Sequence, residues 1–171
     1  MKLAIVILNW NGKKLLAQFL PSIVTFSSDL ADIYIADNAS SDDSIAYVTH
    51  SFPSVKIVRN TSTGGYAKGY NEALRSIEAD LYCLINSDVE VTSNWLTPVI
   101  EVFKREKNTA IIQPKLLDYH YKGKFEYAGA GGGFIDFYGY PYCRGRVFNC
   151  LEKDEGPVSY THLRAHETGY N

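Results

Sequence analysis

The first 115 residues alternate between short apolar runs and stretches with helical spacing, and this alternation restricts the fold more than any other feature of the chain. The apolar runs predict buried strands at residues 3–8, 33–36, 55–58, 81–85 and 110–112. The stretches between them predict helices, because apolar residues recur three and four positions apart. Repeated β-loop-α units indicate an α/β fold with a doubly wound, mostly parallel sheet and helices on both faces.

Four helices are expected in this region. The residues that carry the helical spacing are Leu15, Leu16, Phe19, Leu20 and Ile23; then Ala67, Tyr70, Asn71, Leu74 and Ile77; then Trp95, Leu96, Val99, Ile100 and Phe103. A shorter helix ending at Val48 follows the second strand, and Ser40 with Asp43 has the spacing of a capping box at its start.

The composition is that of an ordinary globular domain. Of the 171 residues, 46% are hydrophobic and 21% are charged, and this length suffices for one core. The net charge of −2 argues against a nucleic-acid partner. No apolar run approaches the roughly 20 residues of a membrane helix, so we expect no membrane span and a cytoplasmic chain. The three cysteines lack metal-ligand spacing and are expected to be reduced.

The pattern changes in the last third of the chain. Residues 119–142 contain glycines, six tyrosines and short apolar pairs, which predicts irregular strands and loops laid over one end of the sheet. The segment 159–171 has no periodicity and resembles translated sequencing-adapter read-through. We therefore expect an incomplete domain at 1–157 and a non-native or disordered tail at 158–171.

Polar loops follow four of the predicted strands. They are Asn9-Trp10-Asn11-Gly12, Asp37-Asn38-Ala39-Ser40, the stretch from Asn60 to Asn71, and Asn86-Ser87-Asp88. Parallel strands bring such loops to one edge of the sheet, where α/β proteins bind ligands. Each loop also has a local explanation, since Asn-Gly favours a turn and Asp caps helices.

Two of these loops suit phosphate chemistry. Asp88 follows an apolar strand, and a carboxylate there can hold a divalent cation that bridges nucleotide phosphates. Gly64-Gly65 opens directly onto a helix, whose first backbone amides can bind an anion. Neither G-x-G-x-x-G nor G-x-x-x-x-G-K-[ST] is present, so the chain carries neither a Rossmann fingerprint nor a Walker loop.

The same loops carry a family resemblance. Residues 6–12, 35–42, 64–71, 84–90 and 113–117 resemble, in order, the motifs of family 2 glycosyltransferases, close to the bacterial rhamnosyltransferase-like branch. The resemblance covers about the first 150 residues. It implies the GT-A fold of nucleotide-diphospho-sugar transferases, truncated at its C-terminal side. The implied activity is inverting sugar transfer, with this chain as the donor-binding part.

The resemblance also implies roles for individual residues. The implied nucleotide-binding residues are Asn9, Asn11, Asp37, Asn38, Gly65, Lys68, Asn71 and Asn86. Asp37 matches the acid that accepts a hydrogen bond from the imide N–H of uracil or thymine. Cytosine lacks that proton, so Asp37 would favour a UDP- or dTDP-sugar as donor.

Asp88 matches the last acid of the family's D-x-D motif, which holds Mn²⁺ or Mg²⁺ against the diphosphate. Asn86 replaces the first acid, which leaves one carboxylate, with Glu90 as a second on the same strand face. We therefore expect modest metal affinity until the diphosphate supplies its own oxygens.

The family's general base, an acid in a Glu-Asp motif, has no match in this sequence. Glu152, Asp154 and Glu155 lie in a charged stretch without the flanking pattern, so no catalytic residue is assigned. One alternative is therefore a non-catalytic nucleotide-binding module. A sugar-1-phosphate nucleotidyltransferase is a further alternative, but it should carry a Gly-rich basic loop where residues 9–12 stand.

The resemblance also implies a biological setting. The acceptor would be a growing glycan or a lipid-linked sugar, in the synthesis of a bacterial surface polysaccharide. Such an acceptor implies peripheral association with the inner face of the membrane. These expectations come from the family and not from individual residues.

Overall fold

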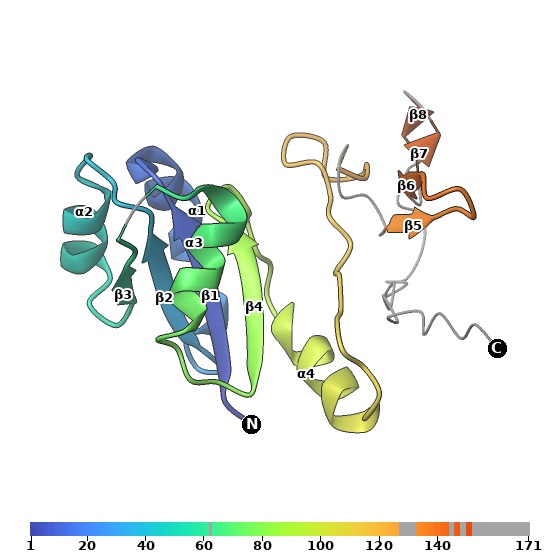
Figure 1. Ribbon diagram of the computed structural model, residues 1–171, viewed down its shortest axis with the longest axis horizontal. Coiled ribbons are helices and arrows are strands. Elements are labelled where there is room, and N and C mark those ends of the chain that lie inside the picture. The colour runs from blue at the N-terminus through green and yellow to red at the C-terminus, as the bar shows by residue number, and fades with distance from the viewer. Residues whose placement is uncertain (62, 127–132, 144–145, 148–149, 152–171) are drawn as a thin grey trace. The chain divides into compact units, whose positions relative to one another are not determined.

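The computed structural model describes residues 1–61, 63–126, 133–143, 146–147 and 150–151. The chain divides into two compact units, Met1–Thr97 and Pro98–Asn171, and each is described by itself (Figure 1). The expected domain at 1–157 is thus described in part, and the expected tail at 158–171 lies outside the described residues.

A four-stranded parallel sheet forms the centre of the first unit (Figure 1). Its strands are β1 (Leu3–Asn9), β2 (Asp32–Asp37), β3 (Lys56–Arg59) and β4 (Leu81–Asn86), in the spatial order β3-β2-β1-β4. β1 is paired with a strand on each side, and its residues Leu3–Ile7 are buried, as its continuous apolar run predicts. The predicted parallel sheet is confirmed.

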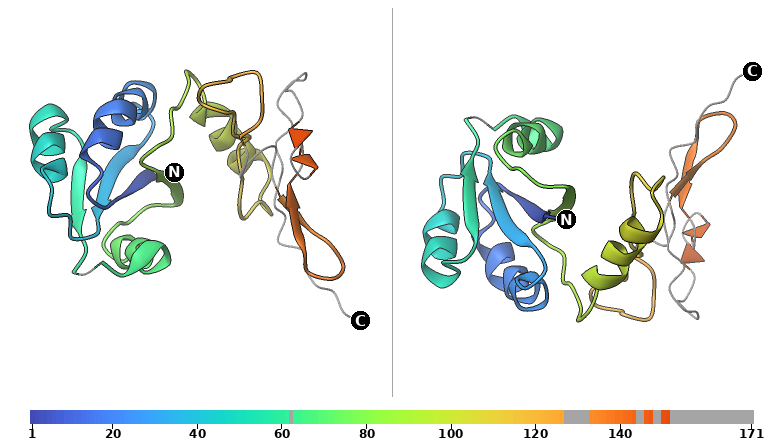
Figure 2. Two further views of the ribbon diagram at one scale, coloured as in Figure 1. Left: turned by 90° about the horizontal axis from the view of Figure 1, so that it is seen from above. Right: turned by 90° about the horizontal axis from the view of Figure 1, so that it is seen from below.

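Helices cover both faces of this sheet. Helices α1 (Lys13–Ser27) and α2 (Ser44–Ser51), blue and teal in Figure 2, lie on one side, and the green helix α3 (Gly65–Leu74) lies on the other. Successive side chains of β1 point to opposite faces of the sheet, so the strand contributes to the apolar core on each face. Val6 packs with Tyr70 of α3, whereas Ile5 and Ile7 point to the opposite face. The doubly wound arrangement is therefore confirmed.

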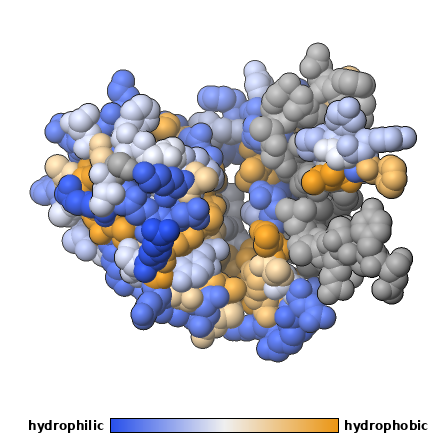
Figure 3. Space-filling view, viewed as in Figure 1, coloured by the Kyte–Doolittle hydropathy of each residue, from blue (hydrophilic) through white to orange (hydrophobic). Residues whose placement is uncertain are grey.

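Strand β4 differs from the fully buried strand that its sequence predicts. Ile85 is buried, but Tyr82 is 42% exposed and Leu84 is 47% exposed. In the described part of the chain β4 pairs only with β1, so it is an edge strand with one open side. Figure 3 shows hydrophobic atoms among the mostly hydrophilic surface of this unit.

The helices also depart from the sequence pattern in detail. Leu15 is 40% exposed, although it fits the apolar spacing of α1. Helix α3 ends at Leu74, so the buried Ile77 lies beyond it. Helix α2 begins at Ser44 and continues past Val48 to Ser51.

Ser40 does not cap α2, which corrects the capping-box prediction. Asp43 occupies the position before the first helical residue, but its side chain makes no hydrogen bond to the end of the helix. The hydroxyl of Ser40 instead accepts hydrogen bonds from Asn9, the last residue of β1, and from Asn11 in the loop after it. The Ser40 hydroxyl, which the local pattern assigned to the helix, thus makes tertiary hydrogen bonds instead.

The second unit contains helix α4 and short strand pairs. Helix α4 spans Leu96–Arg105, so its first two residues belong to the first unit. Strands β5 (Gly133–Ile135) and β6 (Pro141–Cys143) form one antiparallel pair, and β7 (Arg146–Val147) and β8 (Cys150–Leu151) form another.

The strand predicted at residues 110–112 is absent. Ile111 is 57% exposed, and the pairings described nearby are isolated bridges, at Gln113 and between Leu117 and Phe125. Three apolar residues form a strand only when a partner strand accepts their backbone hydrogen bonds. None of the helices in the described ranges is long and apolar enough to cross a membrane.

Candidate functional site

The ends of β1 and β2 place Asn9 directly opposite Asp37. The two residues are register partners in the parallel ladder, and both side chains lie on the face that α2 covers. Asn9 Nδ2 donates to Asp37 Oδ1 at 3.0 Å, and the backbone N–H of Ser40 donates to Asp37 Oδ2 at 3.2 Å. Asp37 is only 2% exposed. A carboxylate has about four acceptor positions, so these two bonds leave acceptor capacity for a ligand.

The amide of Asn9 also joins this carboxylate to two hydroxyl groups. Nδ2 donates to Ser40 Oγ at 3.0 Å and to Ser44 Oγ at 2.9 Å. The two N–H groups of this amide are therefore shared among three acceptor oxygens. The side chain of Asn9 has no exposed surface. Ser44 is the first residue of α2, so the amide ties the helix to the ends of two strands.

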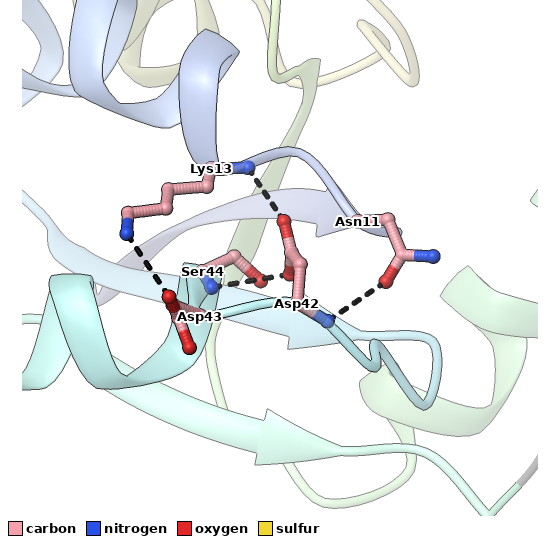
Figure 4. A network of polar contacts seen from close by, with 5 residues as sticks. All are labelled: Asn11, Lys13, Asp42, Asp43 and Ser44. Atoms are coloured by element: carbon pink, nitrogen blue, oxygen red, sulfur yellow. Dashed lines mark hydrogen bonds and ion pairs between the residues drawn. The ribbon is translucent and has the colours of Figure 1, made fainter.

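The loops after β1 and β2 are hydrogen-bonded to each other through Asn11. Asn11 Oδ1 accepts the backbone N–H of Ser41 at 2.7 Å. It also accepts the backbone N–H of Asp42 at 3.2 Å (Figure 4). In return, Ser40 Oγ accepts the backbone N–H of Asn11 at 2.9 Å. Asn11 has a φ of 50°, a left-handed conformation that Asn tolerates better than most residues.

Asp42 connects the first residues of two helices. Its Oδ1 accepts the backbone N–H of Ser44 in α2, and its Oδ2 accepts that of Lys13 in α1, each at 3.1 Å (Figure 4). Partial burial alone would raise the pKa of Asp42, but the hydrogen bonds from Ser44 and Lys13 outweigh it and hold the pKa below the usual value. One ionised carboxylate thus caps both α1 and α2.

A second polar cluster lies on the α3 face of the sheet. Asn60 Nδ2 donates to Asn38 Oδ1 at 2.7 Å and to the Gly69 carbonyl at 2.9 Å, while Asn38 Nδ2 donates to the Gly65 carbonyl at 3.3 Å. A Cβ at Gly69 would lie 2.6 Å from Asn38 Oδ1, so only glycine permits this approach. Gly65 has a φ of 76°, which also favours glycine.

The start of α3 carries positive charge. The aliphatic chain of Lys68 lies against Gly64, the residue before the helix, and no acidic residue occupies the first turn. Both the helix dipole and the ammonium group favour an anion near this end. Asn71 is exposed one turn further along. Glu72 accepts the backbone N–H of Thr61 at 2.6 Å, and this bond lowers the pKa of Glu72.

The loop after β4 lies beside the loop after β1. Ser87 Oγ is 3.9 Å from the position that a Cβ at Gly12 would take. Asn86, Asp88 and Glu90 are exposed. Within the described ranges no three His, Cys, Asp or Glu side chains form a group that could hold a metal ion. Asp88 therefore lacks two further metal-ligating side chains of these types grouped with it in this part of the chain.

An open groove of about 590 Å³ lies along α2. It is lined by Ser40, Asp42 and Arg59 together with residues of the helix, including His50. It shares Ser40 and Asp42 with the loops described above, but Asp37, Gly65 and Asp88 do not line it.

The structure brings together part of the residue set predicted from the sequence. Asn9, Asn11 and Asp37 belong to one cluster, and Asn38 and Gly65 to the other. Four other predicted residues are exposed: Lys68, Asn71, Asn86 and Asp88. Sequence reasoning missed the contributions of Ser44, Asn60 and Asp42, because their roles come from contacts with residues 9 to 35 positions away.

Comparison with known proteins identifies the family. The chain belongs to glycosyl transferase family 2, whose family model matches residues 4–146. Beta-monoglucosyldiacylglycerol synthase of Trichormus variabilis is 27% identical over 85 residues, which are 47% of this chain and 18% of that protein.

Solved structures show the GT-A fold. The TarS 1–349 structure from S. aureus in complex with UDP-GlcNAc matches with a TM-score of 0.57 and 18% identity, over 69% of this chain and 34% of that one. The mannosyltransferase PcManGT from Pyrobaculum calidifontis, in complex with GDP-Man and Mn²⁺, matches with a TM-score of 0.54 and 19% identity, over 68% and 34%. The chain thus spans about a third of the length of these structures.

Proposed function

We propose that this chain is the donor-binding part of an inverting glycosyltransferase that uses a UDP- or dTDP-sugar. The observation that carries the proposal is the Asp37 carboxylate, which is 2% exposed and held by two donors at the carboxyl edge of a parallel sheet. Its remaining acceptor capacity suits the imide N–H of uracil or thymine. A hydrogen bond to a charged group contributes roughly 1.5–3 kcal/mol, enough to discriminate against cytosine.

In this proposal the other residues lie near different parts of the bound nucleotide. Asn38 supports the α3 loop from the second cluster, and Gly65, Lys68 and Asn71 receive the diphosphate at the positive end of α3. Asn9 and Asn11 belong to the loop beside the base.

Asp88 and Asn86 would hold Mn²⁺ or Mg²⁺ once the diphosphate contributes oxygens, because Mg²⁺ sites commonly combine one or two carboxylates with substrate phosphates. The bound cation would neutralise charge that develops on the leaving nucleotide. PcManGT, which was solved with Mn²⁺, is consistent with metal use in this fold.

The acceptor is a growing glycan or a lipid-linked sugar in bacterial surface polysaccharide synthesis, as in the rhamnosyltransferase-like branch. The chain would act in the cytoplasm, in peripheral contact with the inner membrane face. This part of the proposal rests on the family resemblance. TarS, solved with UDP-GlcNAc, supports a uridine nucleotide, whereas PcManGT, solved with GDP-Man, makes guanine the alternative base to test.

The thermal midpoint of the chain with UDP, dTDP, CDP, GDP and ADP, each with Mn²⁺ or EDTA, tests the donor site. Ligand at about 100 times its Kd stabilises by roughly 2.7 kcal/mol, or about 5–10 °C for a chain of this size. We expect this shift with UDP or dTDP and Mn²⁺, and its loss in Asp37→Ala and Asp88→Ala.

Asp29→Ala is the matched control, because Asp29 is an exposed acid in the turn before β2, at the opposite edge of the sheet. Its variant should retain the full shift. A cooperative melt with no shift for any nucleotide, or equal shifts for UDP and CDP, would contradict the proposed donor site.

The second candidate function is nucleotide binding without sugar transfer. It is favoured by the missing Glu-Asp motif, since Glu152, Asp154 and Glu155 lack its flanking pattern. The two candidates differ in one measurement: release of UDP from a donor sugar, with and without a glycan acceptor. Acceptor-dependent release supports transfer, and binding without any release supports the second candidate.

A further inference from the structure

The amide of Asn9 is oriented by its neighbours. Its Nδ2 faces Asp37 Oδ1, Ser40 Oγ and Ser44 Oγ, at 2.9 to 3.0 Å. The reverse orientation would set the Asn9 carbonyl oxygen against a carboxylate oxygen, with no proton between them. The Asp37 carboxylate therefore selects the observed orientation, and the amide in turn fixes the direction in which the carboxylate points.

This orientation leaves the carbonyl oxygen of Asn9 without a hydrogen-bond partner. Asn9 Oδ1 is buried, and the side chain has no exposed surface. Leaving a buried acceptor unsatisfied is unfavourable, so such an atom in a native protein calls for an explanation. The explanation here is that the three bonds made by Nδ2 fix the amide in this orientation and so leave Oδ1 without a partner.

The unpaired oxygen faces Gly12. A Cβ at Gly12 would lie 2.5 Å from Asn9 Oδ1, closer than real Cβ atoms approach other atoms. Gly12 has a φ of −101°, which alanine adopts without strain. The need for glycine at this position therefore comes from the Asn9 side chain and not from the backbone.

We propose that Asn9 is a positioning residue that sets base selectivity: its amide holds the Asp37 carboxylate in the orientation that reads the base, and Gly12 leaves room for that amide. This inference rests on the proposed function, in which Asp37 accepts a hydrogen bond from uracil or thymine. Asn9 itself acts through Asp37, because its fully buried side chain offers no surface to a nucleotide.

A double-mutant cycle tests the inference. UDP and CDP affinities are measured by calorimetry, with Mn²⁺, for the whole chain and for Asn9→Ala, Gly12→Ala and the double variant. Loss of a hydrogen bond to a charged group weakens binding by at least about tenfold. We expect each single variant to weaken UDP by about this factor, to leave CDP nearly unchanged, and so to remove the preference for UDP.

The double variant should bind UDP no more weakly than Asn9→Ala, because the atom that the new Cβ meets is gone. If Asn9→Ala does not melt cooperatively, Gly12→Ala decides by itself, since it keeps the Asn9 side chain. Thermal midpoints without ligand show which variants fold.

The remaining outcomes separate this inference from the proposed function. Equal losses for UDP and CDP, unchanged UDP affinity, or additive losses in the double variant would overturn the positioning role and leave the donor site intact. A wild-type chain that binds neither nucleotide would overturn the donor site, and the positioning role with it.

Discussion

Asp42 stabilises the ends of two helices beside the proposed site, but it has no proposed contact with the nucleotide. Its two oxygens accept the first backbone N–H groups of α1 and α2. Replacing a side-chain cap by alanine costs roughly 0.5–2 kcal/mol, and two caps are lost together here. We therefore expect Asp42→Ala to lower the free energy of unfolding by about 1–3 kcal/mol, a fall of roughly 3–10 °C in the thermal midpoint.

Asp43 provides the matched control, because it is the next residue and carries the same charge. Its carboxylate pairs with Lys13 Nζ at 3.3 Å, but the two side chains are 81% and 47% exposed. Exposed ion pairs contribute less than about 1 kcal/mol. Asp43→Ala should therefore melt close to the wild type, and Asp42→Asn, which keeps one acceptor oxygen, should lie between wild type and Asp42→Ala.

The pH dependence gives an independent check. The folded pKa of Asp42 lies below its ordinary value of 3.8. Its contribution to stability is therefore fully present above about pH 4 to 5 and is lost as the pH falls through the folded pKa. The difference between wild type and Asp42→Asn should shrink in this acidic range, as measured by urea unfolding at a series of pH values.

Two results would show that Asp42 does not act as a shared cap. Equal thermal midpoints for Asp42→Ala and Asp43→Ala would mean that the shared cap contributes no stability. A wild-type advantage over Asp42→Asn that persists unchanged far below pH 4 would mean that the ionised carboxylate is not the capping group.

Two further predictions concern the α3 face and the edge strand. Gly69→Ala should destabilise by about 1–3 kcal/mol in thermal or urea unfolding, because its Cβ would lie 2.6 Å from Asn38 Oδ1 and 2.8 Å from Leu8 Cδ1. Gly123→Ala, whose Cβ would meet no atom within 4 Å, is the control, and equal effects of the two would refute the packing argument. Burial raises the pKa of the Cys83 thiol to about 11, so at pH 8 its thiolate fraction is about a hundredfold below that of a thiol with pKa 9.0. Iodoacetamide should therefore modify Cys83 at least tenfold more slowly in the folded chain than in the chain unfolded in urea. Peptide mass spectrometry measures both rates, and equal rates would contradict the prediction.

The strands of the first unit could be predicted because their signal is local. Residues 3–7 of the apolar run at 3–8 are buried in β1, since a flanked parallel strand packs against helices on each side. The run at 81–85 is also apolar, yet Leu84 is half exposed. Composition shows that a strand can form, but its burial depends on which other segments lie beside it.

The approximate position of the site was also predictable from the sequence. Parallel strands must bring their carboxyl ends to one edge, and the polar residues after β1 and β2 do meet there, as Asn9 and Asp37 show. The partners of each side chain were not predictable. Ser40 has the local spacing of a helix cap, but its hydroxyl bonds to residues 29 and 31 positions away.

The sequence by itself determined the β-loop-α order, the parallel sheet and the edge that carries the polar loops, because these follow from apolar periodicity and chain connectivity. Only the tertiary structure decided that Asn9 is buried against Asp37, that Asp42 caps two helices, and that Gly12 and Gly69 must lack side chains. The physical reason is that hydrogen bonds and close contacts depend on strand register and on loop conformations such as the positive φ of Asn11. Register and loop conformation arise only when segments distant in the chain pack together.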